Sequence, residues 1–168
     1  MRLPIIISAG LLLSFGLNLP VMSNSPIEIV QSPANNNLNL RRLQKQLEFN
    51  RRFWNKQNIS NYDYTLSNSC FCIGDARGPV VIKVRNAQTT SITSVATGKP
   101  VNREFFQNYN TIPKLFDVIQ DAINRKAFSL NVPYNARFGY PTQIDIDYNS
   151  QIADEEIFLT IENFKVIK

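Results

Sequence analysis

Residues 62–72 of the chain read YDYTLSNSCFC, and this stretch sets the first expectation about the fold. Tyr62, Tyr64 and Leu66 alternate with more polar residues. Because successive side chains of a β-strand point to opposite faces, this alternation predicts a strand with one apolar face. Both cysteines of the protein, Cys70 and Cys72, lie at the end of the stretch. The Cys-Phe-Cys unit is therefore the first candidate for chemistry.

The residues before this strand predict an amphipathic helix over residues 38–57. Apolar side chains recur there at helical spacing and fall in one stripe, while basic side chains fall almost opposite. The apolar stripe contains Leu40, Leu43, Leu47 and Trp54, and the basic stripe contains Arg41, Lys45, Arg52 and Lys56. A charged face of this kind is usually solvated, and the alternative is that it contacts an anionic lipid or partner.

The residues after the strand repeat the same order of elements. A loop over 74–79 leads into strands over 80–85 and 89–95, and a second helix begins at Thr111 as its N-cap. Strands are then expected over 130–134, 140–148 and 156–166. The sequence therefore predicts an α+β fold. Two helix-strand-strand-strand units form an antiparallel sheet of about six strands, with both helices on one face.

The N-terminus has the features of an export signal. Met1-Arg2 is followed by an apolar stretch from Leu3 to Leu19, and Val21-Met22-Ser23 places small or apolar residues before a cleavage point. This pattern predicts a signal peptide over residues 1–23, and the alternative is an uncleaved anchor of about 17 apolar residues. Residues 24–37 are expected to be a disordered lead-in, and residues 38–168 a single domain. We expect a secreted or periplasmic protein without a membrane span after cleavage.

Composition narrows the function classes. The chain has 18 Lys and Arg, 13 Asp and Glu and no histidine, and its formal net charge is +5. The lack of histidine removes the commonest general base, the usual zinc ligand and the Ser-His and Cys-His nucleophile arrangements. A mildly basic exported protein is also a poor candidate for nucleic-acid binding. We therefore expect neither an enzyme nor a nucleic-acid partner, and we assign no cofactor.

The two cysteines predict a local disulfide. Thiols in an exported protein normally oxidise. Alternate Cα atoms of a straight strand are about 6.6–6.8 Å apart, at the upper edge of disulfide geometry, so a Cys70–Cys72 bond requires the strand to bend or stop there. A ring this small contributes only ~1.6 kcal/mol. Two reduced thiols are one alternative, and a thiol redox or soft-metal-handling site is the other, although no third metal ligand is evident.

An acidic segment late in the chain resembles a calcium loop only in part. Residues 145–156 read DIDYNSQIADEE, with oxygen-bearing side chains at positions 1, 3, 5 and 12 of an EF-hand pattern. Ser150 stands where that pattern needs glycine, and both flanks are expected to be strands. A solvated acidic hairpin is therefore expected. The alternative is a weak cation-binding loop formed by Asp145, Asp147, Asp154 and Glu156.

The aromatic residues just before the second helix allow two interpretations. Residues 105–109 read FFQNY, and most aromatic side chains of a domain this size belong to its core. The alternative is that this segment forms an exposed recognition patch.

Several short signatures occur in a fixed order along the chain. After YDYT (62–65) and CFC (70–72) come GPV (78–80), TGKPV (97–101), TIPKLFD (111–117), GYPT (139–142) and IADEE (152–156). In this order the chain resembles, over roughly residues 50 to 165, the exported bacterial family catalogued as domain of unknown function 6174. The resemblance implies an exported or envelope-attached domain and supplies no activity. We expect a non-catalytic module that binds an exported or envelope protein, with thiol redox or soft-metal handling as the alternative function.

Overall fold

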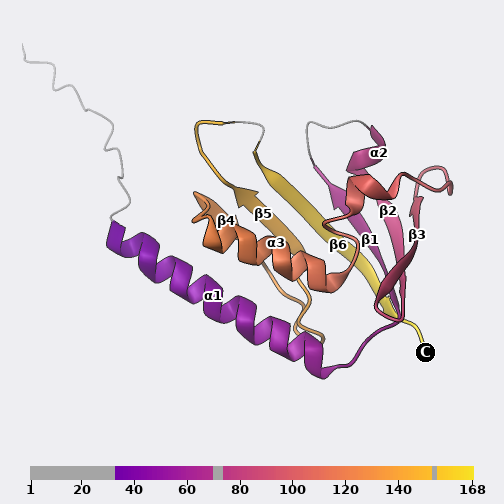
Figure 1. The fold of residues 1–168 in the computed structure, drawn as a ribbon, viewed down its shortest axis with the longest axis horizontal. Coiled ribbons are helices and arrows are strands. Elements are labelled where there is room, and N and C mark those ends of the chain that lie inside the picture. Colours follow the sequence, from indigo (N-terminus) through magenta and orange to yellow (C-terminus); the bar gives the residue numbers. More distant parts are fainter. Residues whose placement is uncertain (1–32, 70–73, 153–154) are drawn as a thin grey trace, which may run out of the picture. The chain divides into compact units, whose positions relative to one another are not determined.

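Six antiparallel strands form a sheet in the computed structural model of the protein, which describes residues 33–69, 74–152 and 155–168. The strand order is β3-β2-β1-β6-β5-β4, and the two long helices lie on one face of the sheet (Figure 1). The predicted α+β fold with its two helix-strand-strand-strand units is confirmed. In chain order the elements are α1 (Pro33–Lys56), β1 (Tyr62–Asn68), α2 (Gly74–Arg77), β2 (Val80–Arg85), β3 (Gln88–Ser94), η1 (Arg103–Phe106), α3 (Ile112–Asn124), β4 (Ser129–Asn131), β5 (Gln143–Asp147) and β6 (Ile157–Val166).

β1 is the strand that joins the two halves of the sheet. It pairs with β2 of its own unit on one side and with β6 of the second unit on the other. Tyr62, Tyr64 and Leu66 are at most 1% exposed, as the alternating pattern predicted. Their face lies under the helices, where the apolar stripes of α1 and α3 pack. Tyr62, Tyr64 and Leu66 are therefore part of the hydrophobic core.

β6 keeps its apolar side chains on the core face by means of a bulge. Its pairing with β1 shifts between Asp63 and Thr65, and Asn163 has a positive φ of 51°. One extra residue in a strand reverses the facing of the residues beyond it. The bulge therefore turns Phe164 inward, and its ring lies 4.5 Å from the ring of Tyr140, centre to centre.

Some element boundaries differ from the expected ones. α1 begins at Pro33, so it extends five residues into the stretch expected to be a lead-in, while the earlier part of that stretch lies outside the described residues. Proline suits the first turn of a helix because the amide hydrogen that it lacks has no partner there. β4 ends at Asn131, short of the expected Tyr134, because Pro133 cannot donate to a ladder. The short helix α2 occupies most of the expected loop over 74–79.

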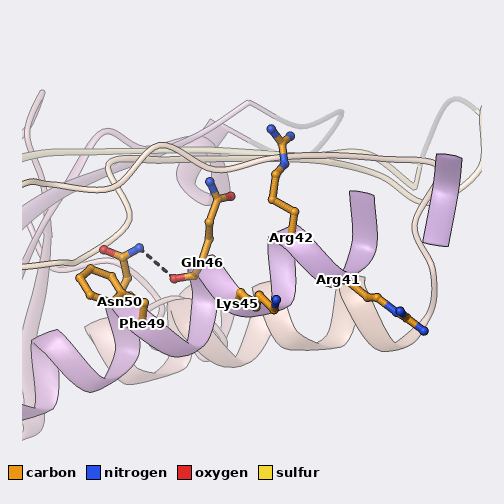
Figure 2. A pocket seen from close by; sticks show the side chains of 6 residues that line it. All are labelled: Arg41, Arg42, Lys45, Gln46, Phe49 and Asn50. Carbon is orange, nitrogen blue, oxygen red and sulfur yellow. Dashed lines mark hydrogen bonds between the residues drawn. The ribbon is translucent and has the colours of Figure 1, made fainter. Parts of the chain in front are cut away.

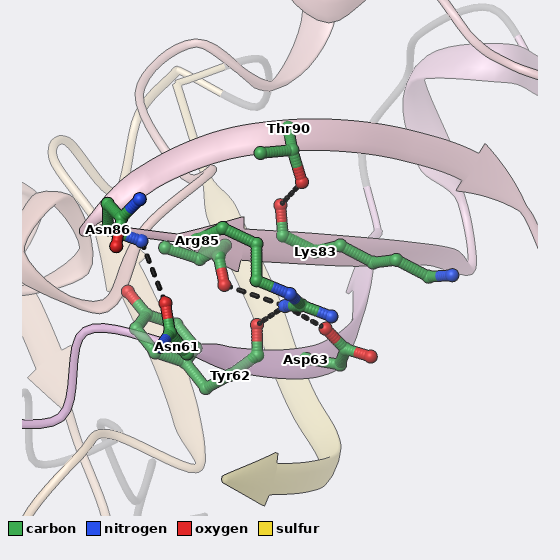
Figure 3. Close-up of polar contacts among 8 residues, drawn as sticks. Asn61, Tyr62, Asp63, Lys83, Arg85, Asn86 and Thr90 are labelled. Carbon is green, nitrogen blue, oxygen red and sulfur yellow. Dashed lines mark hydrogen bonds and ion pairs between the residues drawn. The ribbon is translucent and has the colours of Figure 1, made fainter. Parts of the chain in front are cut away.

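Polar contacts tie β1 to β2 on the face turned away from the helices (Figure 3). The guanidinium of Arg85 lies 2.7 Å from the carboxylate of Asp63 and also donates to the backbone carbonyls of Tyr62 and Val84. A partly exposed ion pair of this kind contributes at most about 1 kcal/mol.

No helix in the described part of the chain is long and apolar enough to span a membrane.

Candidate functional site

A cleft of about 510 Å³ lies along the outward face of α3, and we call it the α3 cleft. Four parts of the chain contribute to it: α3 itself, the loop before α3, the residue after β5 and the first residue of β6. The residues that line it are Asn108, Tyr109, Lys114, Asp117, Val118, Asp121, Arg125, Tyr148 and Ile157.

The sequence of α3 decides which of its side chains reach the cleft. Thr111 caps the helix in an extended conformation, and its hydroxyl accepts a hydrogen bond from the amide of Lys114 at 3.4 Å. Residues at helical spacing, among them Leu115 and Ile119, are at most 1% exposed and hold one side of the helix against the sheet. The opposite side therefore faces outward, and it supplies the row Lys114, Val118, Asp121 and Arg125.

Two tyrosines of β1 position the start of α3 and the loop before it. The hydroxyl of Tyr64 donates to the carbonyl of Tyr109 at 2.6 Å, and the hydroxyl of Tyr62 accepts from the amide of Ile112 at 3.0 Å. Lys114 Nζ also donates to the carbonyl of Gln107 at 2.5 Å. The two tyrosine bonds satisfy buried or partly buried polar groups, and all three bonds hold one wall of the α3 cleft in place.

The polar wall of the cleft is built around Tyr148. Its hydroxyl donates to Asp121 Oδ2 at 3.0 Å, and the guanidinium carbon of Arg125 lies 3.8 Å from the centre of its ring. Arg125 also lies 3.7 Å from the same carboxylate oxygen. Burial, helped by the hydrogen bond to Asp121, raises the pKa of Tyr148 to about 12. At neutral pH the side chain is a neutral phenol.

The remaining charged side chain on the wall is also paired. Asp117 forms an ion pair with Arg51 of α1, with 3.0 Å between the nitrogen and the oxygen. Burial raises the pKa of Tyr109 as well, so both phenols of the cleft are protonated at neutral pH. Half-buried Val118 and Ile157 add apolar surface. The arrangement offers hydrogen bonds, a stacked cation and apolar contact to a ligand.

The predicted cysteine pair lies outside the described residues, as do Phe71 and Ile73. β1 ends at Asn68, and in the described residues the next backbone bond after it is donated by Ser69 to the carbonyl of Phe158 at 2.9 Å. The Cys70–Cys72 bond and the thiol redox or soft-metal alternative both stay predictions.

The acidic segment is only partly brought together. Asp145 Oδ2 accepts hydrogen bonds from the side-chain amides of Gln143 and Asn131, at 2.6 and 3.2 Å. Oδ1 of Asp147 is buried without a hydrogen-bond partner in the described residues, Glu156 is exposed, and Asp154 lies outside them. Among the residues that the structure describes, no three His, Cys, Asp or Glu side chains are placed to hold a metal ion. The cation-binding loop stays a prediction.

The aromatic segment before α3 divides between core and cleft. Phe106 is fully buried, and Phe105 and Tyr109 are half-buried. Tyr109 alone of the three lines the α3 cleft. The contribution of Tyr148 was missed by the sequence argument, which placed it only on a strand. The polar residues at helical spacing in α3 could have indicated the cleft from the sequence. No local sequence pattern relates these residues to Tyr148.

Comparison with known proteins identifies a family without assigning a function. Neither the curated proteins nor the solved structures gave a match to the chain. A family model described as a family of unknown function (DUF6174) matches residues 46–166. The matched range begins inside α1 and ends at the last residue of β6, so it contains every strand of the sheet. The chain therefore belongs to the family of unknown function DUF6174.

Proposed function

We propose that this protein is a non-catalytic, exported binding domain whose α3 cleft takes an extended segment of an exported or envelope protein. The observation that carries the proposal is the wall formed by Tyr148, Asp121 and Arg125, a neutral phenol fixed between a carboxylate and a stacked guanidinium. Tyrosine and arginine held in this way are the side chains that most often dominate binding energy in protein interfaces.

The chemistry of the cleft suits a peptide better than a reactive substrate. A peptide backbone offers both donors and acceptors, which match the phenol and amide groups of Tyr148 and Asn108. Its side chains would cover Val118 and Ile157. The volume of about 510 Å³ lies in the range of ordinary binding sites. The acids of the cleft are engaged by Arg51, Arg125 and Tyr148, so neither is free to act as a general base in the way that hydrolysis requires.

The edges of the sheet are less suited to a partner than the cleft. The outer edge of β3 is occupied, because its Ile92 carbonyl accepts from the amide of Val101 and its Thr90 carbonyl accepts from Arg103. β4 at the other edge has only three residues and is followed two residues later by Pro133. Short edges and proline both discourage the addition of a further strand. A partner is therefore expected to bind across a surface rather than to extend the sheet.

Export belongs to the same proposal. The signal-like residues 1–23, cleavage after Ser23, a secreted or periplasmic location and a Cys70–Cys72 disulfide are its sequence-based parts.

Site-specific crosslinking tests the proposal. A photoreactive amino acid replaces Asn108 in the cleft in one variant and exposed Thr160 on β6 in another, and both are expressed in cells that export the protein. We expect a discrete crosslinked partner at position 108 and none at position 160. Val118→Arg, which fills the cleft, should reduce that crosslink at least tenfold, while Thr160→Arg should leave it unchanged. Equal crosslinking at both positions, or a crosslink at 108 that survives Val118→Arg, would contradict the proposal.

A further inference from the structure

The positive charge of this protein is concentrated on one helix. Of the 18 Lys and Arg and 13 Asp and Glu in the chain, α1 contains six of the former and one of the latter. Its formal charge of +5 equals that of the whole chain, and the remaining residues hold twelve charges of each sign. An asymmetry of this size produces a local positive field and points to an anionic partner.

The cations lie in a row on the outward side of α1. Arg41, Lys45, Arg52 and Lys56 are spaced by four, seven and four residues, so they follow one line along the helix over about 22 Å. All four are exposed, and they lie opposite the buried Leu43, Leu47 and Trp54. Of the α1 cations, only Arg51 forms an ion pair with an acid elsewhere in the described residues. The row is therefore free to bind an external anion.

An exposed aromatic side chain interrupts this row of cations. Phe49 is 63% exposed, the largest exposed fraction of any large apolar side chain in the described residues. It falls between Lys45 and Arg52 and lines a hollow of about 530 Å³. Figure 2 shows the side chains that line this hollow, which are Arg41, Arg42, Lys45, Gln46, Phe49 and Asn50. An apolar ring flanked by cations is the arrangement with which helices bind the surface of anionic bilayers.

We propose that the outward side of α1 binds the surface of an anionic phospholipid bilayer. The four cations contact headgroup phosphates, and the ring of Phe49 enters the boundary between headgroups and acyl chains. A nucleic acid would need only the cations for binding, whereas a lipid bilayer also accounts for the exposed ring of Phe49.

Vesicle binding by the protein as recovered after export tests this inference. We expect binding to vesicles of phosphatidylcholine with 30% phosphatidylglycerol to exceed binding to pure phosphatidylcholine at least tenfold at low salt. The excess should fall steeply as the salt concentration is raised, because the contacts are electrostatic. The triple variant Arg41→Glu, Lys45→Glu and Arg52→Glu should lose the excess. Its matched control, Lys83→Glu, Lys99→Glu and Lys165→Glu, changes three exposed cations elsewhere by the same charge and should retain most of it.

Two further variants separate lipid insertion from general attraction. Phe49→Ala keeps every cation and should weaken binding to the anionic vesicles several-fold. In the Phe49→Trp variant, the emission of the introduced indole should shift to shorter wavelength on the same vesicles. The emission of Trp54 should not shift, because that side chain is already buried. Equal loss in the two triple variants, or no preference for phosphatidylglycerol, overturns the inference. So does an unshifted Phe49→Trp spectrum, or binding of polyglutamate without binding of vesicles, which would identify an acidic protein as the partner.

Discussion

Tyr62 and Tyr64 each have two roles, and a phenylalanine at the same position could fill only the first of them. Their rings fill the core beneath the helices, and their hydroxyls bond to the backbone at the start of α3 and in the loop before it. Burial raises the pKa of Tyr62 to about 12 and that of Tyr64 well above its usual value, so both hydroxyls are protonated at neutral pH. At the scale of single residues, the strand that centres the core also places the α3 cleft.

Gly139 is a position at which neighbouring atoms of α1 leave no room for a Cβ. Its φ is +79°, and a Cβ there would lie 2.9 Å from the carbonyl oxygen of Asn50 and 2.9 Å from a ring carbon of Phe53. We expect Gly139→Ala to lower the free energy of unfolding by about 2–4 kcal/mol, from the left-handed conformation and the contact with α1 together. Urea denaturation measures the difference.

Gly98→Ala is the control for that substitution. Gly98 has a similar φ of +67°, but nothing lies within 4 Å of the position that its Cβ would take. Only the conformational cost of about 1–2 kcal/mol applies there. If the two variants lost the same stability, the contact between Gly139 and α1 would have no energetic weight.

At the scale of elements, each helix and strand follows from a local pattern, and its ends follow from a few particular residues. α3 begins where Thr111 caps it, and β4 stops before Pro133. The bulge at Asn163 is less readily predicted, although the spacing of Leu159, Ile161 and Phe164 breaks the alternation at that point. A break of one residue in an alternating pattern is the trace that a bulge leaves in a sequence.

Thr111→Ala tests the cap of α3. The change removes the hydroxyl that accepts from the Lys114 amide, and we expect it to lower the free energy of unfolding by about 1 kcal/mol. Thr111→Ser restores a hydroxyl without the methyl group and should recover most of that loss. Thermal or urea denaturation of both variants measures the effect. A serine variant as unstable as the alanine variant would assign the loss to the buried methyl group instead of the cap.

At the scale of the whole molecule, the two units share one sheet because β1 pairs with β6. The closing strand of the second unit thus lies beside the first strand of the first unit. Both helices then cover the same face, and the other face carries polar groups such as the Asp63–Arg85 pair. The charge on α1 and the cleft on α3 lie on separate helices, so the two proposed contacts are open to separate tests.

The mass of the exported protein tests the sequence-based part of the proposal. We expect the protein recovered from outside the cytoplasm to lack residues 1–23 and to be two hydrogens lighter than its reduced form. Alkylation should therefore modify Cys70 and Cys72 only after treatment with reductant. Retention of the first 23 residues would favour the anchor, and alkylation without reductant would contradict the disulfide.

Local patterns in the sequence were sufficient for the two long helices, the six strands and their order along the chain, but not for the short helices α2 and η1. Alternation in residues 62–66 and helical spacing in α1 and α3 depend only on neighbouring residues, so the two helix-strand-strand-strand units and their buried faces were predictable. Tertiary structure alone decided the strand order, the β1–β6 pairing and the α3 cleft. Tyr148 and Asp121 are 27 residues apart, and the Tyr64–Tyr109 bond spans 45. Contacts at such separations depend on how the chain packs as a whole, and no local pattern records them.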